Sequence, residues 1–472
     1  MGPVALWGGV LLLLAAPLMR GGNRHVALIG LEWLALAVLL ALLARRGAAP
    51  LPASDSRHAA VSGLAFALLL TAPLWIAAVQ LAPLPSRLWF SLPAHAPYAD
   101  TLAAVQAGGR DWRPLSVSPD ATAAALLAGL PIVAAFLLGW RASLGQLRVL
   151  LGAVVAMAFA QVLLGLLQFA GGPGSPLFFG VDTYGPPVGS FANRNHFANY
   201  LAMALVALVW LGYESSREAR RHTPSGAGVF HTGHKAMLWA GGALVLLLGI
   251  LLSLSRGAAV FGLPMAVLAF VAVVLRTQGW ARGWRFAVAA SLLLLVLAAA
   301  MIGFGTVGAR LSGGQLADSA GFRGLLARTS LEGAWAFWPL GAGWGTYDVA
   351  YPRFQPAAIP GFANHAHQDY AELLFEGGAL FLLAALAFAW LAVRRAAALA
   401  RLALRRVPLD REQMAAALCG LGLLALLLHS LVEFNMRIPA NAMLGALLAG
   451  AFLRPLPGKA HGNSGAATRG RA

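Results

Sequence analysis

Three arginines stand out because their residue type and surroundings fit the binding of an anionic substrate. Arg194 follows a Ser-Phe-Ala-Asn run, Arg256 lies in a Ser-Leu-Ser-Arg-Gly turn, and Arg323 follows Gly-Phe. Arginine binds phosphate through a planar pair of donors and keeps its charge at physiological pH. One arginine at a helix end can simply extend its charge into water. Three such residues from separate segments favour an anion-binding site.

A histidine-rich segment follows further along the chain, with the order His365-Ala366-His367-Gln368-Asp369. Histidine is the natural general base or acid near neutral pH. The spacing also suggests metal ligands, but a metal site needs more ligands downstream, and the chain instead enters an apolar run at Leu373. We therefore expect no metal and take His367, which lies just before the apolar run, as the candidate acid–base residue.

Glycine and aromatic residues are concentrated just before this segment. The run Gly341-Ala342-Gly343-Trp344-Gly345 does not follow a strand of a βαβ unit, so it predicts a glycine-rich turn and not a dinucleotide site. Aromatic side chains in this region either stack on sugars or anchor loop helices at a membrane interface. They are Trp335, Trp338, Trp344 and Tyr347.

The composition requires that these residues be positioned by a membrane protein. Apolar residues make up 59% of the 472 and charged residues 11%, against about half and a quarter in soluble domains. Apolar blocks recur at about the 20-residue length that crosses a bilayer. They predict an all-α, polytopic bundle of about 12 spans, near residues 4–19, 26–44, 61–82, 121–140, 147–170, 196–213, 236–254, 257–275, 286–304, 373–393, 414–432 and 438–453.

The spans divide the chain into four parts. Spans 1–9 occupy residues 1–304, a large loop with short helices occupies 305–372, spans 10–12 occupy 373–453, and a disordered tail occupies 454–472. The first block lacks a basic flank and a cleavage site, so we expect a retained span and not a signal peptide. The single cysteine, Cys419, cannot form an intrachain disulfide and is expected to be a buried apolar residue.

The distribution of positive charge predicts the orientation. An even number of spans places both termini on one side. With the termini in the cytoplasm, 22 of the 34 Lys and Arg residues fall on inner segments, as the positive-inside rule requires. Both long loops, near 83–120 and 305–372, then face outward. The net charge of +17 fits inner loops resting on anionic lipid. No basic run interleaved with aromatics indicates a nucleic-acid groove.

Several motifs, in their order along the chain, resemble the O-antigen ligase and O-antigen polymerase superfamily. The resemblance covers most of the chain from about Pro114 onward. Its motifs are Ser190–Ala198, the turn 253–257, Arg323 upstream of Pro339-Leu340-Gly341, His367-Gln368-Asp369-Tyr370 with Glu376-Gly377-Gly378, and the tail His429–Phe434 with Ile438–Ala442.

The resemblance implies a twelve-span fold with a large periplasmic loop between spans 9 and 10. It implies a metal-independent, inverting glycosyltransferase that needs no cofactor and uses an undecaprenyl-pyrophosphate-linked glycan as donor. The family's pyrophosphate-binding arginines correspond to Arg194 and Arg256, with Arg323 as a third. The catalytic histidine corresponds to His367. Supporting positions are Asn193, Asn195 and Asp369.

The function expected from this resemblance is an O-antigen or polysaccharide ligase of the bacterial inner membrane, acting in lipopolysaccharide biosynthesis with lipid A–core as acceptor. Gly377-Gly378 is followed by Ala-Leu-Phe, whereas ligases space these glycines more widely, so a polymerase stays open as an alternative. A protein O-oligosaccharyltransferase and a transporter of lipid-linked sugars are further alternatives. A transporter should carry charges near mid-membrane, but Glu32 and Glu433 lie near span ends.

Overall fold

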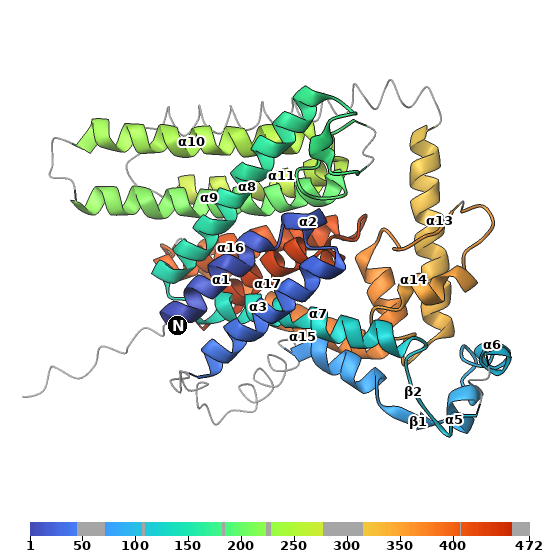
Figure 1. Ribbon diagram of the computed structural model, residues 1–472. Coiled ribbons are helices and arrows are strands. Elements are labelled where there is room, and N and C mark those ends of the chain that lie inside the picture. The colour runs from blue at the N-terminus through green and yellow to red at the C-terminus, as the bar shows by residue number, and fades with distance from the viewer. Residues whose placement is uncertain are drawn as a thin grey trace, which may run out of the picture.

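The structure is a computed structural model that describes residues 1–44, 71–105, 109–181, 185–222, 228–276, 315–359, 361–405 and 407–455. These residues form a bundle of helices that run side by side (Figure 1). The one sheet described is a pair of short antiparallel strands, β1 (Pro83–Pro85) and β2 (Trp112–Pro114), with Leu84 opposite Arg113. The predicted helical class is thus confirmed.

Among the described residues, six helices are long and apolar enough to cross a membrane. They are α3 (His25–Leu43), α7 (Pro119–Arg141), α8 (Leu144–Gly171), α9 (Arg194–His222), α15 (Asp369–Leu404) and α16 (Arg411–His429). Shorter apolar stretches of helix lie beside them. These are α1 (Pro3–Ala15), the part Met237–Leu252 of α10 (Gly228–Leu252), the π-helical turn η2 (Ala258–Gly262) with α11 (Leu263–Arg276), and α17 (Pro439–Leu453). The chain is therefore a membrane protein.

Ten of the predicted spans coincide with these described helices. Residues 71–80 form a helix within the predicted span 61–82, but the rest of that span and all of 286–304 lie outside the described residues. The predicted tail, 454–472, also lies almost wholly outside them. The total of about 12 spans therefore stays a prediction.

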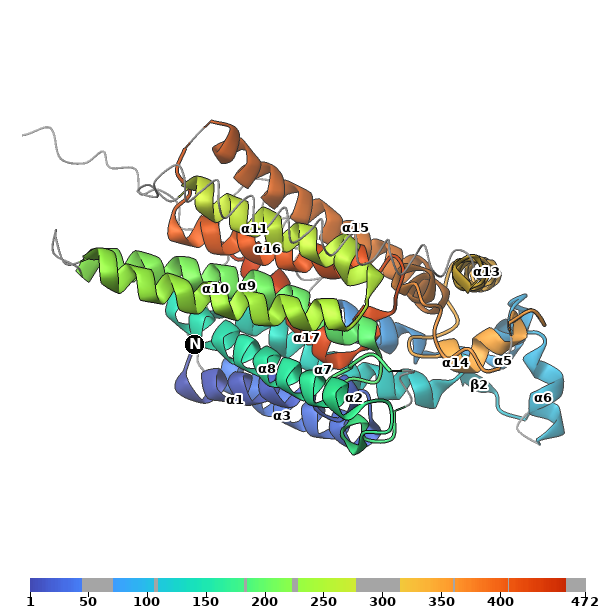
Figure 2. The same ribbon diagram turned by 90° about the horizontal axis from the view of Figure 1, so that it is seen from above.

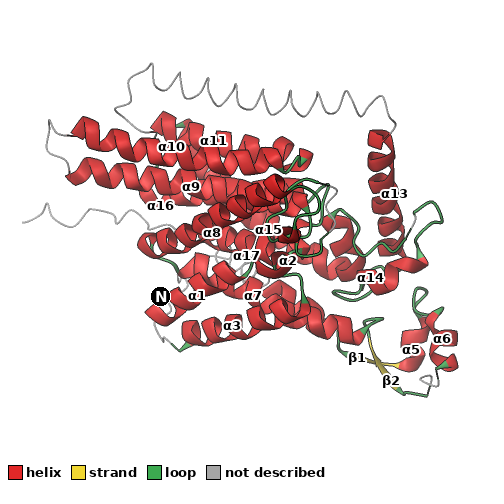
Figure 3. Cartoon of the chain, turned by 45° about the horizontal axis from the view of Figure 1, so that its top comes forward, coloured by secondary structure: helices red, strands yellow, loops and turns green. Residues whose placement is uncertain are grey.

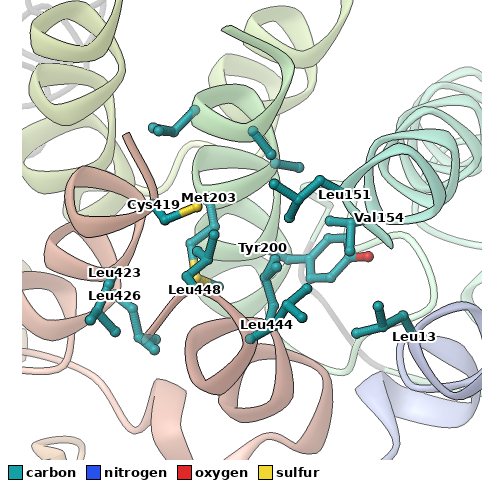
Figure 4. Packing of buried hydrophobic residues seen from close by; sticks show 14 of the residues in the cluster. Leu13, Leu151, Val154, Tyr200, Met203, Cys419, Leu423, Leu426, Leu444 and Leu448 are labelled. Atoms are coloured by element: carbon teal, nitrogen blue, oxygen red, sulfur yellow. The ribbon is translucent and has the colours of Figure 1, made fainter. Parts of the chain in front are cut away.

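Helix α9 occupies the centre of the bundle. Within its apolar window, 94% of the residues are buried, against 22% for α3 at the periphery. It contacts α8, α10, α11, α16 and α17. Tyr200 and Met203 of α9 lie among apolar side chains of α8 and α17, including Leu151 and Leu444 (Figure 4). The first residues of α9, which carry Arg194 and Asn195, are thus held at one end of the core.

A smaller set of elements gathers at that same end (Figures 2 and 3). It includes α2 (Leu18–Gly21), α5 (Ser86–Ser91), α6 (Tyr98–Ala104), η1 (Pro176–Phe178), α13 (Gln315–Ala336), α14 (Tyr347–Ala350), η3 (Tyr351–Arg353) and η4 (Asn435–Arg437). Helix α13 runs across the direction of the spans and packs against α15. A separate apolar cluster around Leu326, Phe337 and Phe375 holds this end together.

A break in α15 fixes the segment that carries the histidines. Gly378 has φ +52°, a conformation that favours glycine, and a Cβ there would strike the carbonyl of Pro339. The turn before α14 docks into this break. Ala379 N–H donates to Pro339 O at 2.8 Å, and Ala342 N–H donates to Phe375 O at 3.0 Å. The glycine-rich run is thus a turn, as predicted, and it holds the outer part of α15.

Candidate active site

A fully buried carboxylate, Glu433, lies in the connection between α16 and η4. His367 Nδ1–H donates to its Oε1 at 2.7 Å, and Asn195 Nδ2–H donates to its Oε2 at 2.6 Å. Arg323 pairs with Oε2 at 3.2 Å, and Phe434 N–H donates to Oε1 at 3.3 Å. A buried charge is tolerated where it is paired and hydrogen-bonded. Three predicted site residues from distant segments therefore meet at one carboxylate.

This contact orients the His367 ring. Burial raises the pKa of the Glu433 carboxyl, but the hydrogen bond from His367 and the charge of Arg323 lower it more, so that it lies well below its usual range. An ionised carboxylate only accepts hydrogen bonds, so His367 Nδ1 carries a proton. Whenever the imidazole is neutral, its lone pair is therefore on Nε2. This is the arrangement of a general base oriented by a carboxylate.

The backbone at His367 is unusual. Its φ is +51°, in the left-handed region that residues with a side chain seldom occupy, and its side chain is 28% exposed. Leu254, in the turn that carries Arg256, has the same conformation with φ +53°. Such backbone strain concentrates at functional sites. Two of the turns that carry predicted site residues therefore show it.

The three predicted arginines occupy different positions around Glu433. Arg323 reaches from α13 and also donates to the carbonyl of Val432 at 3.0 Å. Arg194 is the first residue of α9 and is partly buried, beside Asn195. Arg256 is exposed, and its neighbour Ser255 donates from Oγ to Asn195 Oδ1 at 2.8 Å. The structure thus brings all three chain segments to the same end of the bundle, and Arg323 contacts Glu433 directly.

The predicted supporting residues have distinct contacts. Asn193 Oδ1 accepts from Asn195 N–H at 2.7 Å and so caps the start of α9. Asp369 Oδ2 accepts from Met436 N–H at 2.8 Å, and its own N–H is directed to the Ser430 and Glu433 carbonyls. The Asp369 carboxylate therefore holds the start of α15 against η4.

A phenylalanine at the centre of the site was not expected from the sequence. The Phe434 ring stacks on His365 with centroids 4.1 Å apart, and its neighbours His367 and His196 approach in T-shaped contacts at 4.8 and 4.5 Å. The sequence signal for Glu433 and Phe434 was a glutamate beside an aromatic residue at the end of an apolar run. That signal did not show which distant residues would contact them.

A second buried ionic cluster adjoins the first. Arg437 pairs with Glu372 at 2.9 Å and, in a short contact, with Glu376. His365 Nδ1 lies 2.9 Å from Glu372 Oε1, and Ala366 N–H donates to Glu372 Oε2 at 2.8 Å. His365, which the resemblance does not match to the catalytic histidine, therefore belongs to this buried cluster.

The structure also separates the aromatic residues expected near a glycan. Tyr347 is 2% exposed and its hydroxyl is hydrogen-bonded to Ser330, so its ring cannot stack on a substrate, and that interpretation is corrected. Trp344 lies against the Arg437 guanidinium. Trp335 and Trp338 are 76% and 41% exposed and stack on each other, so their rings stay accessible.

Residues 241–389 match the family model described as O-Antigen ligase. This part of the chain is similar to the O-antigen ligase family. The matched range contains Arg256, Arg323 and His367, whereas Arg194 and Glu433 lie outside it. No curated protein was found to match the chain. The match supports the resemblance seen in the motifs over this range.

Proposed function

We propose that this protein transfers a glycan from an undecaprenyl-pyrophosphate donor to an acceptor hydroxyl, as an O-antigen or polysaccharide ligase. The observation that carries the proposal is the hydrogen bond from His367 to buried Glu433, with Arg323 on the same carboxylate. A histidine oriented by a carboxylate suits deprotonation of a hydroxyl, and neighbouring arginines suit a pyrophosphate.

In this reaction His367 is the general base. Its Nε2 accepts the proton of the acceptor hydroxyl as the hydroxyl oxygen attacks the anomeric carbon of the donor. A new carbon–oxygen bond forms on one face, and the bond to pyrophosphate breaks on the other, so the configuration inverts. The electron pair of the broken bond leaves on the pyrophosphate oxygen. Glu433 stabilises the imidazolium that forms, and such acid–base help contributes a factor of about 10² to 10⁴.

Arginines stabilise the leaving group. We assign this role to Arg194 and Arg256, which take the place of the divalent cation that many sugar-transfer enzymes use. Fixed positive charge at the site of developing negative charge needs no reorganisation, and removal of one such donor costs about 3–4 kcal/mol in the transition state. Arg323 pairs with Glu433, so we assign it to stabilising the carboxylate that orients His367.

We propose that the bundle lies in the bacterial inner membrane. Its site faces the periplasm, and both termini lie in the cytoplasm. The placement of charge along the helices supports this. Helix α16 begins at Arg411 and ends at His429, just before Glu433. Helix α15 begins just after His367 and carries Arg394, Arg395 and Arg401 towards its other end. The basic residues of both helices therefore lie at the end away from the site, where the positive-inside rule expects the cytoplasm.

Transfer of glycan by purified protein in detergent tests the proposal. We expect His367→Ala and Arg194→Ala to lose transfer, and Arg256→Lys to fall by about tenfold or more because lysine cannot bind phosphate in a bidentate manner. Arg328→Ala is the matched control, since this exposed arginine of α13 pairs only with Glu332. Normal transfer by His367→Ala would remove the assigned base. Redistribution of lipid-linked glycan across vesicles without transfer would indicate a transporter.

The acceptor is tested in the same assay. We propose lipid A–core, and we expect label to move from the lipid-linked donor to that acceptor. Extension of the donor glycan itself would indicate a polymerase, and label on serine or threonine of an added protein would indicate an O-oligosaccharyltransferase. Reporter fusions at residue 350 and in the tail test the orientation, since a cytoplasmic residue 350 would contradict a periplasmic site.

A further inference from the structure

His365 and His367 form two histidine–glutamate pairs beside one phenylalanine ring. Both imidazoles lie within 5 Å of the Phe434 centroid, His365 stacked on the ring and His367 in a T-shaped contact with it. Each Nδ1 contacts a buried glutamate. Neither Nε2 has a partner among the described residues, and neither is among their fully buried polar atoms. Both Nε2 atoms are therefore accessible to a substrate.

The two pairs differ in their balance of charge. Glu433 is already paired with Arg323, so its negative charge is compensated without a charge on His367. His365 instead faces Glu372, and Glu376 lies on the next turn of α15, with Arg437 as the one cation that contacts both. Two buried carboxylates against one arginine leave one negative charge uncompensated, which is costly in a buried place.

Both of these glutamates have the contacts of ionised groups. Glu372 receives Ala366 N–H on one oxygen, and His365 and Arg437 on the other. Glu376 receives Tyr347 N–H at 3.0 Å on one oxygen and Arg437 on the other. Because every contact to their four oxygens comes from an N–H group, each carboxylate acts only as an acceptor. A proton on His365 therefore completes the balance.

The surroundings of His365 stabilise that proton. Burial lowers the pKa of the His365 imidazole, but the charge and hydrogen bond of Glu372 raise it more, and the net pKa lies above its ordinary value. The remaining charged or titratable groups that face His365 are Arg437 on η4, which lowers this pKa, Glu376 on α15, which raises it, and His196 on α9. The stacked face of Phe434 also favours a cation.

We propose that His365 is a cationic binding residue that donates its Nε2–H to an anionic oxygen of the substrate, while His367 accepts the hydroxyl proton. The identity of that substrate rests on the proposed function. The anion is a phosphate of the lipid donor or an acidic group of the acceptor glycan. Two neighbouring histidines would thus perform opposite tasks, as happens where environments push the pKa values of two similar groups apart.

Binding of a lipid-pyrophosphate-linked N-acetylglucosamine to the purified full chain tests this role. Its two phosphates are esterified and carry constant charge between about pH 6 and pH 10, so only protein groups titrate in that range. His365→Asn keeps an amide N–H facing Glu372 and removes Nε2. We expect it to bind the probe about tenfold or more weakly at pH 6, the loss of one hydrogen bond to a charged group. Wild-type affinity should fall towards that level as the pH rises.

His25→Asn, at an exposed histidine of α3, is the matched control, and its affinity should keep the pH dependence of the wild type. A second probe is a phosphorylated lipid A–core fragment without lipid pyrophosphate. His365→Asn should bind more weakly than the wild type only to the probe whose anionic group contacts His365, so the two probes together show which substrate carries the anion. Equal affinity of His365→Asn and wild type for both probes at pH 6 would overturn the inference. A wild-type affinity that does not change with pH would also overturn the inference. This measurement needs no variant, so it remains a test even if His365→Asn fails to fold. Failure of the wild type to bind either probe would instead overturn the proposed function as well.

Discussion

Replacement of Glu433 by glutamine tests the core of the proposed site, because it removes the charge and keeps the shape. Glu433 is fully buried and holds His367 at 2.7 Å, Asn195 at 2.6 Å and Arg323 at 3.2 Å. A glutamine amide offers one oxygen in place of two and brings an NH₂ group towards donors that need an acceptor. Either His367 or the Asn195–Arg323 side therefore loses its partner.

The expected size of the effect follows from these contacts. A hydrogen bond to a charged group contributes about 1.5–3 kcal/mol, and a lost carboxylate also leaves the imidazolium formed during reaction without compensation. We expect kcat for glycan transfer to fall by about 10- to 100-fold, as is typical when a group that orients a histidine is lost. KM for the donor should change less, because Arg194 and Arg256 are assigned to its pyrophosphate.

The assay is steady-state transfer by purified protein, with Glu332→Gln as the matched control. Glu332 is an exposed carboxylate of α13 whose described ion pair is with Arg328, and such pairs contribute less than about 1 kcal/mol. In a double variant, Glu433→Gln should add little to His367→Ala, since both act through the same proton transfer. Wild-type kcat in a well-folded Glu433→Gln protein would refute the assignment of His367 as an oriented base.

The same carboxylate predicts a dependence of stability on pH. The pKa of folded Glu433 lies below the ordinary value of 4.5, so its contribution to stability is fully present above about pH 4.5 and is lost as the pH falls towards the folded pKa. Thermal unfolding in detergent should show a gap in Tm between wild type and Glu433→Gln that is constant above about pH 5 and shrinks below it. A gap that widens on acidification would contradict the pairing.

Two further predictions concern the packing around the site. Gly257→Ala places a Cβ against Nε2 of His429 and should destabilise the protein by about 1–3 kcal/mol through overpacking. In the control Gly241→Ala, the new Cβ meets open space. Equal Tm values for the two variants would contradict the close contact at Gly257. Arg437→Met removes the cation shared by two buried carboxylates and should lower the free energy of unfolding in detergent by about 3–5 kcal/mol. Exposed Arg328→Met should lower it by less than about 1 kcal/mol. A small decrease for both variants would show that the second cluster does not stabilise the fold.

The amino-acid sequence was sufficient to predict the bundle and the segments that carry the site. Apolar runs of bilayer length are a local signal, and ten of the predicted spans coincide with described helices. The motifs around Arg256, Arg323 and His367 fall within the range that matches the O-antigen ligase family. The glycine-rich turn before α14 was also predicted from residue type, since glycine tolerates the backbone conformations that a turn requires. The break of α15 at Gly378 was not predicted.

Only the tertiary structure showed which residues these segments bring together. The partners of Glu433 lie 66, 110 and 238 residues away along the chain, and no local periodicity encodes such separations. For the same reason the sequence could not distinguish the roles of His365 and His367, which stand two positions apart. They differ in how the carboxylates beside them are compensated. Beside His365, Arg437 is shared by Glu372 and Glu376, whereas beside His367, Arg323 pairs with Glu433. The charge of a buried histidine depends on partners that meet it only in the folded bundle.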